Sequence, residues 1–131
     1  MKSTLALLLF LALPGFADEI VFRGLPSLRV ISSTDHDERK QLDGDAARDA
    51  ESVIVQRGKN KYFWQSRNNA PMMRVDTPGF TYFIHTGGLG YVKVLTGERK
   101  ATNAPADYIE SFTRGFDVIT YWGRVAIGAS Q

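Results

Sequence analysis

The stretch that decides the fold runs from Lys61 to Leu95, KYFWQSRNNAPMMRVDTPGFTYFIHTGGLGYVKVL. Aromatic and β-branched residues recur in it in short runs, which is typical of β-strands. Two turn signals divide these runs, Thr77-Pro78-Gly79 and Gly87-Gly88-Leu89-Gly90. Proline suits the second position of a type II turn, and glycine suits the third, where φ is positive. The pattern predicts an antiparallel meander of strands: Lys61–Arg67, Met72–Val75, Phe80–Thr86 and Tyr91–Leu95.

Upstream of this stretch the pattern is less regular. Glu19–Arg23 and Leu28–Ile31 are rich in apolar and β-branched residues, and they predict two short strands separated by Gly24-Leu25-Pro26. Ser32–Lys40 is polar and has no apolar period, so we expect it to be an exposed loop.

Two short helices are expected. Asp43 or Asp45 can cap the first helix, which must end before the β-branched run Ser52–Arg57 begins a new strand. Pro105 fits the first turn of a second helix, Ala106–Arg114. The apolar stripe of this second helix is expected to be buried and consists of Tyr108, Ile109, Phe112 and Phe116. A final strand is expected over Asp117–Trp122, with Val125-Ala126-Ile127 as its extension.

Together these patterns predict an α+β fold. We expect a single antiparallel, strongly twisted sheet of six to seven short strands around the meander core, with one or two short helices packed on it. Such a sheet can curl into a half-barrel. Membrane insertion is not expected, because the strands of a membrane barrel need ~9–11 residues and the predicted strands are mostly shorter.

Residues 1–17 have the build of a cleaved export signal of bacterial type. Lys2 supplies the positive charge, Leu5–Leu13 is an unbroken apolar run, and small residues stand at Gly15 and Ala17. The apolar run is shorter than the ~20 residues of a membrane-spanning helix. We therefore expect cleavage near Ala17, and residues 18–131 to form a single soluble domain in the periplasm or outside the cell.

Composition excludes several classes of function. The chain has no cysteine, which removes disulfide scaffolds, thiol redox chemistry and thiolate metal sites. Its sixteen basic and fourteen acidic residues nearly balance, so there is no electrostatic case for a nucleic-acid partner. No phosphate-binding glycine loop or nucleophile elbow is present, and no cofactor is expected.

The two histidines are the obvious candidates for chemistry. His85 is expected at the edge of the core with a backbone hydrogen bond, and it is the candidate general base if an acid or nucleophile lies beside it. His36 lies in the run Asp35-His36-Asp37-Glu38, where neighbouring side chains of an extended chain point to opposite sides. We therefore expect no metal site there.

A ligand-binding site is expected where the Trp64 strand meets the polar run after it. An indole beside amides and a guanidinium suits sugars or a peptide backbone. In the predicted hairpin Ile84 lies opposite Lys93, which places tyrosines and a lysine on the wet face of the sheet. The expected site consists of Trp64, Ser66, Arg67, Asn68, Tyr82, Tyr91 and Lys93.

These expectations favour an exported, small, non-catalytic binding protein, whose partner is a protein, a peptide or a glycan. Two alternatives remain open at this point. One is a small secreted hydrolase that uses His85 as its base, and the other is a structural protein of the cell envelope.

Overall fold

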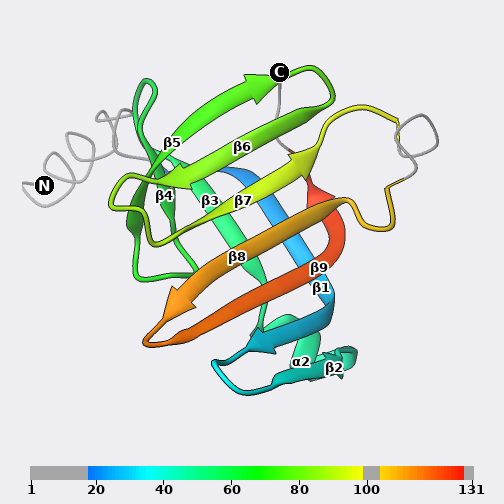
Figure 1. The fold of residues 1–131 in the computed structure, drawn as a ribbon. Helices are drawn as coiled ribbons and strands as arrows, with labels where there is room; N and C mark the ends of the chain where they lie inside the picture. The colour runs from blue at the N-terminus through cyan, green and yellow to red at the C-terminus, as the bar shows by residue number, and fades with distance from the viewer. Residues whose placement is uncertain (1–17, 99–103, 129–131) are drawn as a thin grey trace, which may run out of the picture.

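The computed structural model describes residues 18–98 and 104–128, and the expected export signal at residues 1–17 lies outside them. The chain forms an eight-stranded antiparallel β-barrel with one extra strand, β2 (Figure 1). The predicted α+β fold with an open sheet is therefore wrong, because the first and last strands pair and close the sheet. The elements are β1 Glu19–Ser32, β2 Asp37–Gln41, α2 Gly44–Asp49, β3 Ser52–Gln56, β4 Tyr62–Trp64, β5 Ala70–Thr77, β6 Phe80–His85, β7 Gly90–Leu95, β8 Tyr108–Arg114 and β9 Asp117–Ile127.

Strand β1 is the seam of the barrel. One of its edges pairs with β9 over Arg23–Ser32, and the other pairs first with β3 and then with β2. The predicted break at Gly24-Leu25-Pro26 is instead an irregular part of one strand, with a register shift between Pro26 and Leu28. Such a bulge tolerates the missing N–H of proline and bends the strand.

Close backbone packing at the seam requires glycine. A Cβ placed on Gly123 of β9 would lie 2.2 Å from the carbonyl oxygen of Leu25 on β1. That distance is far inside van der Waals contact, and the atom concerned is a backbone atom that cannot swing away. The barrel can therefore close here only because position 123 has no side chain.

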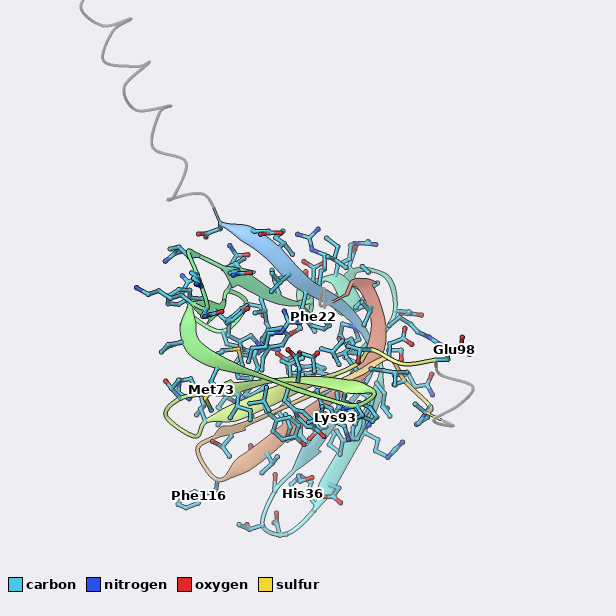
Figure 2. The ribbon with its side chains drawn as sticks, turned by 90° about the horizontal axis from the view of Figure 1, so that it is seen from above. Phe22, His36, Met73, Lys93, Glu98 and Phe116 are labelled. Atoms are coloured by element: carbon cyan, nitrogen blue, oxygen red, sulfur yellow. The ribbon has the colours of Figure 1, made fainter. Side chains whose placement is uncertain are left out.

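The predicted helix over Ala106–Arg114 is wrong, and this segment is strand β8. Tyr108 and Glu110 are buried, whereas Ile109 on the other face is only partly buried. This alternation has the period of a strand. The predicted burial of Phe116 is also wrong, because that side chain is 92% exposed at the tip of the β8–β9 hairpin (Figure 2).

The predicted loop over Ser32–Lys40 is also wrong for its second half, which is strand β2. All five residues of β2 are exposed, so no apolar period marks it in the sequence. Among the described strands it pairs only with β1, and its Asp, Glu, Arg and Lys side chains suit an edge strand, where charge opposes pairing with other chains. The expected short helix near Asp43 is present as α2, which lies beside β2 at one end of the barrel (Figure 1).

Side chains fill the barrel, as is usual for eight strands. The fully buried large side chains include Phe22, Ile54, Trp64, Phe83 and Val92. A second, smaller cluster closes the end at which α2 lies, and it consists of Leu42, Ala47, Ile119 and Tyr121. The core is therefore built almost entirely from inward-facing strand residues.

The β6–β7 hairpin differs from its predicted register by two residues. Tyr82, and not Ile84, lies opposite Lys93, and Ile84 lies opposite Tyr91. A shift of two residues leaves every side chain on its predicted face, because side chains alternate with a period of two. Phe83 and Val92 therefore face the core, while Tyr82, Tyr91 and Lys93 face outward.

Candidate functional site

The structure divides the predicted binding residues between two places. Trp64, Ser66, Arg67 and Asn68 lie at the β4–β5 end of the barrel. Tyr82, Tyr91 and Lys93 lie on the outer wall formed by β6 and β7. The predicted residues do not form one site.

Trp64 belongs to the core and not to a surface site. It is fully buried, and its indole Nε1–H donates a hydrogen bond of 2.7 Å to Oε2 of Glu110 on β8. Its ring packs edge-on against Phe112, with 6.0 Å between the ring centroids. A ligand on the surface cannot reach this indole.

Arg67 closes the same end of the barrel. Its guanidinium donates a hydrogen bond of 2.8 Å to Oε1 of Glu110 and lies 4.5 Å from the ring centre of Phe112. Ser66 accepts the Val53 N–H through its hydroxyl at 3.0 Å. Asn68 has a φ of 56°, a left-handed turn conformation that asparagine tolerates. Ser66 and Arg67 thus bond to β3 and β8 at the end of the barrel, and Asn68 lies in the turn that follows them.

Glu110 is the centre of this cluster, and no pattern in the sequence singles it out. Its carboxylate is fully buried and also accepts a 3.0 Å hydrogen bond from the hydroxyl of Ser52. Burial raises the pKa of Glu110, and the positive charge of Arg67 acts in the opposite direction. Burial also raises the pKa of the nearby Tyr108 phenol above its usual range. These hydrogen bonds join β3, β4 and the loop after β4 to β8 at one end of the barrel.

Neither histidine forms a catalytic pair. Nδ1 of His85 accepts the backbone N–H of Leu89 at 3.0 Å, and among residues 18–98 and 104–128 no carboxylate or hydroxyl is bonded to this ring. His36 is exposed at the β1–β2 turn and is bonded to Asp35. In the described part of the chain no three His, Asp or Glu side chains group as metal ligands would.

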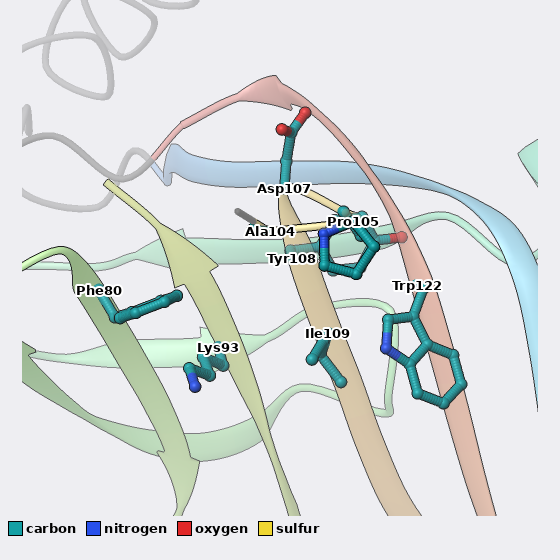
Figure 3. A pocket seen from close by; sticks show the side chains of 9 residues that line it. Phe80, Lys93, Ala104, Pro105, Asp107, Tyr108, Ile109 and Trp122 are labelled. Atoms are coloured by element: carbon teal, nitrogen blue, oxygen red, sulfur yellow. The ribbon is translucent and has the colours of Figure 1, made fainter. Parts of the chain in front are cut away.

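The outer wall of β6 to β9 carries a continuous row of large side chains. The strand registers place Tyr82 beside Lys93, Lys93 beside Ile109, and Ile109 beside Trp122. Figure 3 shows Lys93 and Ile109 between Phe80 on one side and Trp122 on the other. We call this surface the aromatic wall, defined as Phe80, Tyr82, Ile84, Tyr91, Lys93, Ile109 and Trp122.

The aromatic wall is hollowed on both sides of Lys93. One hollow of about 290 Å³ is lined by Tyr82, Ile84, Tyr91 and Lys93. The other, of about 240 Å³, contains Phe80, Lys93, Ile109 and Trp122 together with the segment from Ala104 to Tyr108 (Figure 3). Lys93 is common to both. The wall therefore offers two neighbouring apolar recesses with a cation between them.

Charge is sparse on this wall. The Lys93 ammonium lies 4.2 Å from the ring centre of Phe80 and 5.6 Å from that of Tyr82. Asp107, at the far side of the second hollow, accepts the Val125 N–H at 3.1 Å and lies near Arg124. The carboxylate of Asp107 is thus already engaged, and Lys93 provides the positive charge at the centre.

The predicted site contains three residues of the aromatic wall, Tyr82, Tyr91 and Lys93. It lacks the other four, which are Phe80, Ile84, Ile109 and Trp122. The predicted helix over Ala106–Arg114 includes Ile109, and a helical period does not show the strand alternation that points Ile109 outward. Trp122 belongs to a strand that was predicted, and its alternation with the buried Tyr121 is the signal that places it outside.

No family model, curated protein or solved structure was found to match this chain. Within the described residues, no helix has the length and apolar character to cross a membrane.

Proposed function

We propose that this protein is an exported, small, non-catalytic binding protein whose partner docks on the aromatic wall. The observation that carries the proposal is the row of Tyr82, Lys93, Ile109 and Trp122 on the solvent side of four adjacent strands. Tyrosine and tryptophan supply large contact areas with polar tips, and they are enriched at the energetic centres of interfaces.

Among the residues that the structure describes, the main core and helix α2 both lie away from the aromatic wall. The core lies on the opposite side of the same strands, where Phe83, Val92 and Val94 are buried. Helix α2 contributes to the cluster with Ile119 and Tyr121 at the end of the barrel, away from this wall. Tyr91 is 39% exposed, and the other six residues of the wall are partly exposed. Contiguous apolar side chains that a protein leaves exposed mark interaction surfaces more often than chance.

The hydrolase alternative has less support. A general base needs a free nitrogen and a proton donor within reach. One nitrogen of His85 is taken by Leu89, and the imidazole lies at the β6–β7 hairpin, so it does not share a hollow with Tyr82 or Lys93.

The proposal of export rests on the sequence of residues 1–17 alone. Mass analysis of the processed chain tests it, with Asp18 expected as the first residue.

Site-specific photo-crosslinking in the native cells tests the docking surface. A benzophenone amino acid in place of Tyr91 should yield a discrete, partner-sized adduct. The matched control replaces Phe63, an aromatic residue of β4 that is partly buried on the outer side of the barrel, away from β7. Adducts at position 63 but not at position 91 would contradict the proposal, and so would the absence of adducts at position 91 in correctly folded protein.

A further inference from the structure

We propose that the partner presents an acidic peptide segment whose carboxylate lies on Lys93, with an apolar side chain in each neighbouring hollow. This inference rests on the proposed function and names the chemistry of the partner. It follows from the charge at the centre of the aromatic wall, the position of the two hollows on either side of Lys93, and the few polar groups that line them.

Lys93 is a cation without an acidic partner in an apolar setting. Within residues 18–98 and 104–128, no carboxylate lies within ion-pair distance of its ammonium, which lies over the rings of Phe80 and Tyr82. Several arginines of the same molecule do have acidic partners, among them Arg57 with Asp18 and Arg67 with Glu110. A carboxylate arriving at Lys93 would gain a charge-assisted hydrogen bond beside apolar groups that exclude part of the solvent.

The two hollows lie on either side of Lys93, so one extended peptide can reach both. One hollow lies over β6 and β7, and the other extends from Phe80 on β6 across β8 to Trp122 on β9. In a polyproline II segment, residues i and i+3 point to the same side and lie ~9 Å apart. The residues between them point to the other two sides of the helix, and the flexible side chain of a Glu there can turn back toward Lys93, which lines both hollows.

The lining favours a peptide over a glycan. The hollows are walled mainly by aliphatic and aromatic carbon, including Ile84, Ile109 and Pro105. A glycan needs several fixed hydrogen-bonding groups, and the Asp107 carboxylate in the second hollow already accepts from a backbone N–H. The negative charge of Asp107 also disfavours an acid at that end, which directs the ligand carboxylate to Lys93.

Amide-detected NMR titration of residues 18–131 with three capped tetrapeptides tests the inference. The probes are acetyl-Leu-Glu-Pro-Phe-amide and its variants with Gln or Lys in place of Glu. We expect shift changes confined to the outer residues of β6 to β9, and roughly two- to fivefold tighter binding of the Glu peptide than of the Gln peptide. Lys93→Met should remove that preference. Lys61→Met, which removes an exposed lysine before β4, should leave it intact.

The outcomes separate this inference from the proposed function. Equal binding of the Glu and Gln peptides, or an unchanged preference in Lys93→Met, would overturn the acidic partner while leaving docking on the wall in place. Binding of an oligosaccharide of uronic acids at the wall, with no peptide binding there, would overturn the peptide class. The proposal that a partner docks on the aromatic wall is contradicted only if position 91 yields no crosslinked adduct.

Discussion

Glu110 loses all contact with water inside the barrel, and its stability there depends on its partners. Three groups donate hydrogen bonds to its two oxygens: Trp64, Ser52 and Arg67. Buried carboxylates are tolerated only when they are paired and hydrogen-bonded. Arg67 is the one cation among these donors, and its side chain is 21% exposed at the end of the barrel.

Replacing Arg67 by Met should destabilise the fold by about 3 kcal/mol, at the low end of the cost of breaking a buried ion pair, because Arg67 keeps some contact with water. The double variant Arg67→Met, Glu110→Gln should lose less, since no unpaired carboxylate remains. Urea unfolding measures both. A loss below about 1 kcal/mol for Arg67→Met would mean that the pair contributes no more than a surface contact.

Asp76 provides a second prediction at this scale. Its carboxylate accepts a 2.6 Å hydrogen bond from the buried Thr81 hydroxyl, and this bond lowers the pKa of Asp76 below its usual value of 3.8. A pKa that is lower in the folded state than in the unfolded state contributes stability at pH values above the unfolded pKa. This contribution is lost as the pH falls through the folded pKa. Asp76→Asn should therefore be less acid-sensitive than the wild type below about pH 4. If the free energy of unfolding falls equally with pH in the wild type and in Asp76→Asn, the lowered pKa of Asp76 is contradicted.

At the scale of single elements, β8 shows how two periods compete in one sequence. Tyr108, Ile109 and Phe112 fit a helical stripe by spacing, and Pro105 fits a helix start. The same segment alternates between core and solvent when it is extended, with Glu110 between Tyr108 and Phe112 on the core side. Sequence reasoning disfavours the extended pattern because it places the Glu110 carboxylate in the core. The hydrogen bonds that make this burial possible come from β3, β4 and the loop after β4.

Two phenylalanines distinguish strand from helix in this element. Phe112 packs against Trp64 and Tyr121, so Phe112→Ala should cost about 3 kcal/mol of stability. Phe116→Ala should stay within about 0.5 kcal/mol, because the hairpin tip leaves this side chain in water. A buried helical stripe would make both substitutions costly. Comparable losses in urea unfolding would therefore contradict the assignment of β8.

At the scale of the whole molecule, closure depends on a pairing that local sequence does not encode. The short strands of the meander, and the faces of their side chains, follow from alternation and turn chemistry between Lys61 and Leu95. The pairing of β1 with β9 joins the two ends of the described chain, and no local pattern signals it. The predicted binding residues show the same contrast between local and distant signals. Local alternation predicts the faces of Tyr82, Tyr91 and Lys93. It does not predict that Trp64 is buried and bonded to Glu110, which lies far away in the sequence.

Gly123→Ala tests closure through stability. The added methyl would meet the backbone of β1, and the strands must separate to admit it, so we expect a loss of about 1–3 kcal/mol. Gly97→Ala is the matched control, since a Cβ there would meet its nearest atom at an ordinary 3.5 Å. Equal effects in thermal or urea unfolding would mean that β1 and β9 are not in close contact.

The most direct measurement is the set of cross-strand proton contacts in the NMR spectrum of residues 18–131. A closed barrel places Tyr82, Lys93, Ile109 and Trp122 in one row on its outer wall. We predict contacts from Lys93 to Ile109, from Ile109 to Trp122, and from Trp122 to Leu28 across the seam. Contacts between residues three apart along Tyr108–Arg114, with none from Trp122 to Leu28, would contradict both the barrel and its wall.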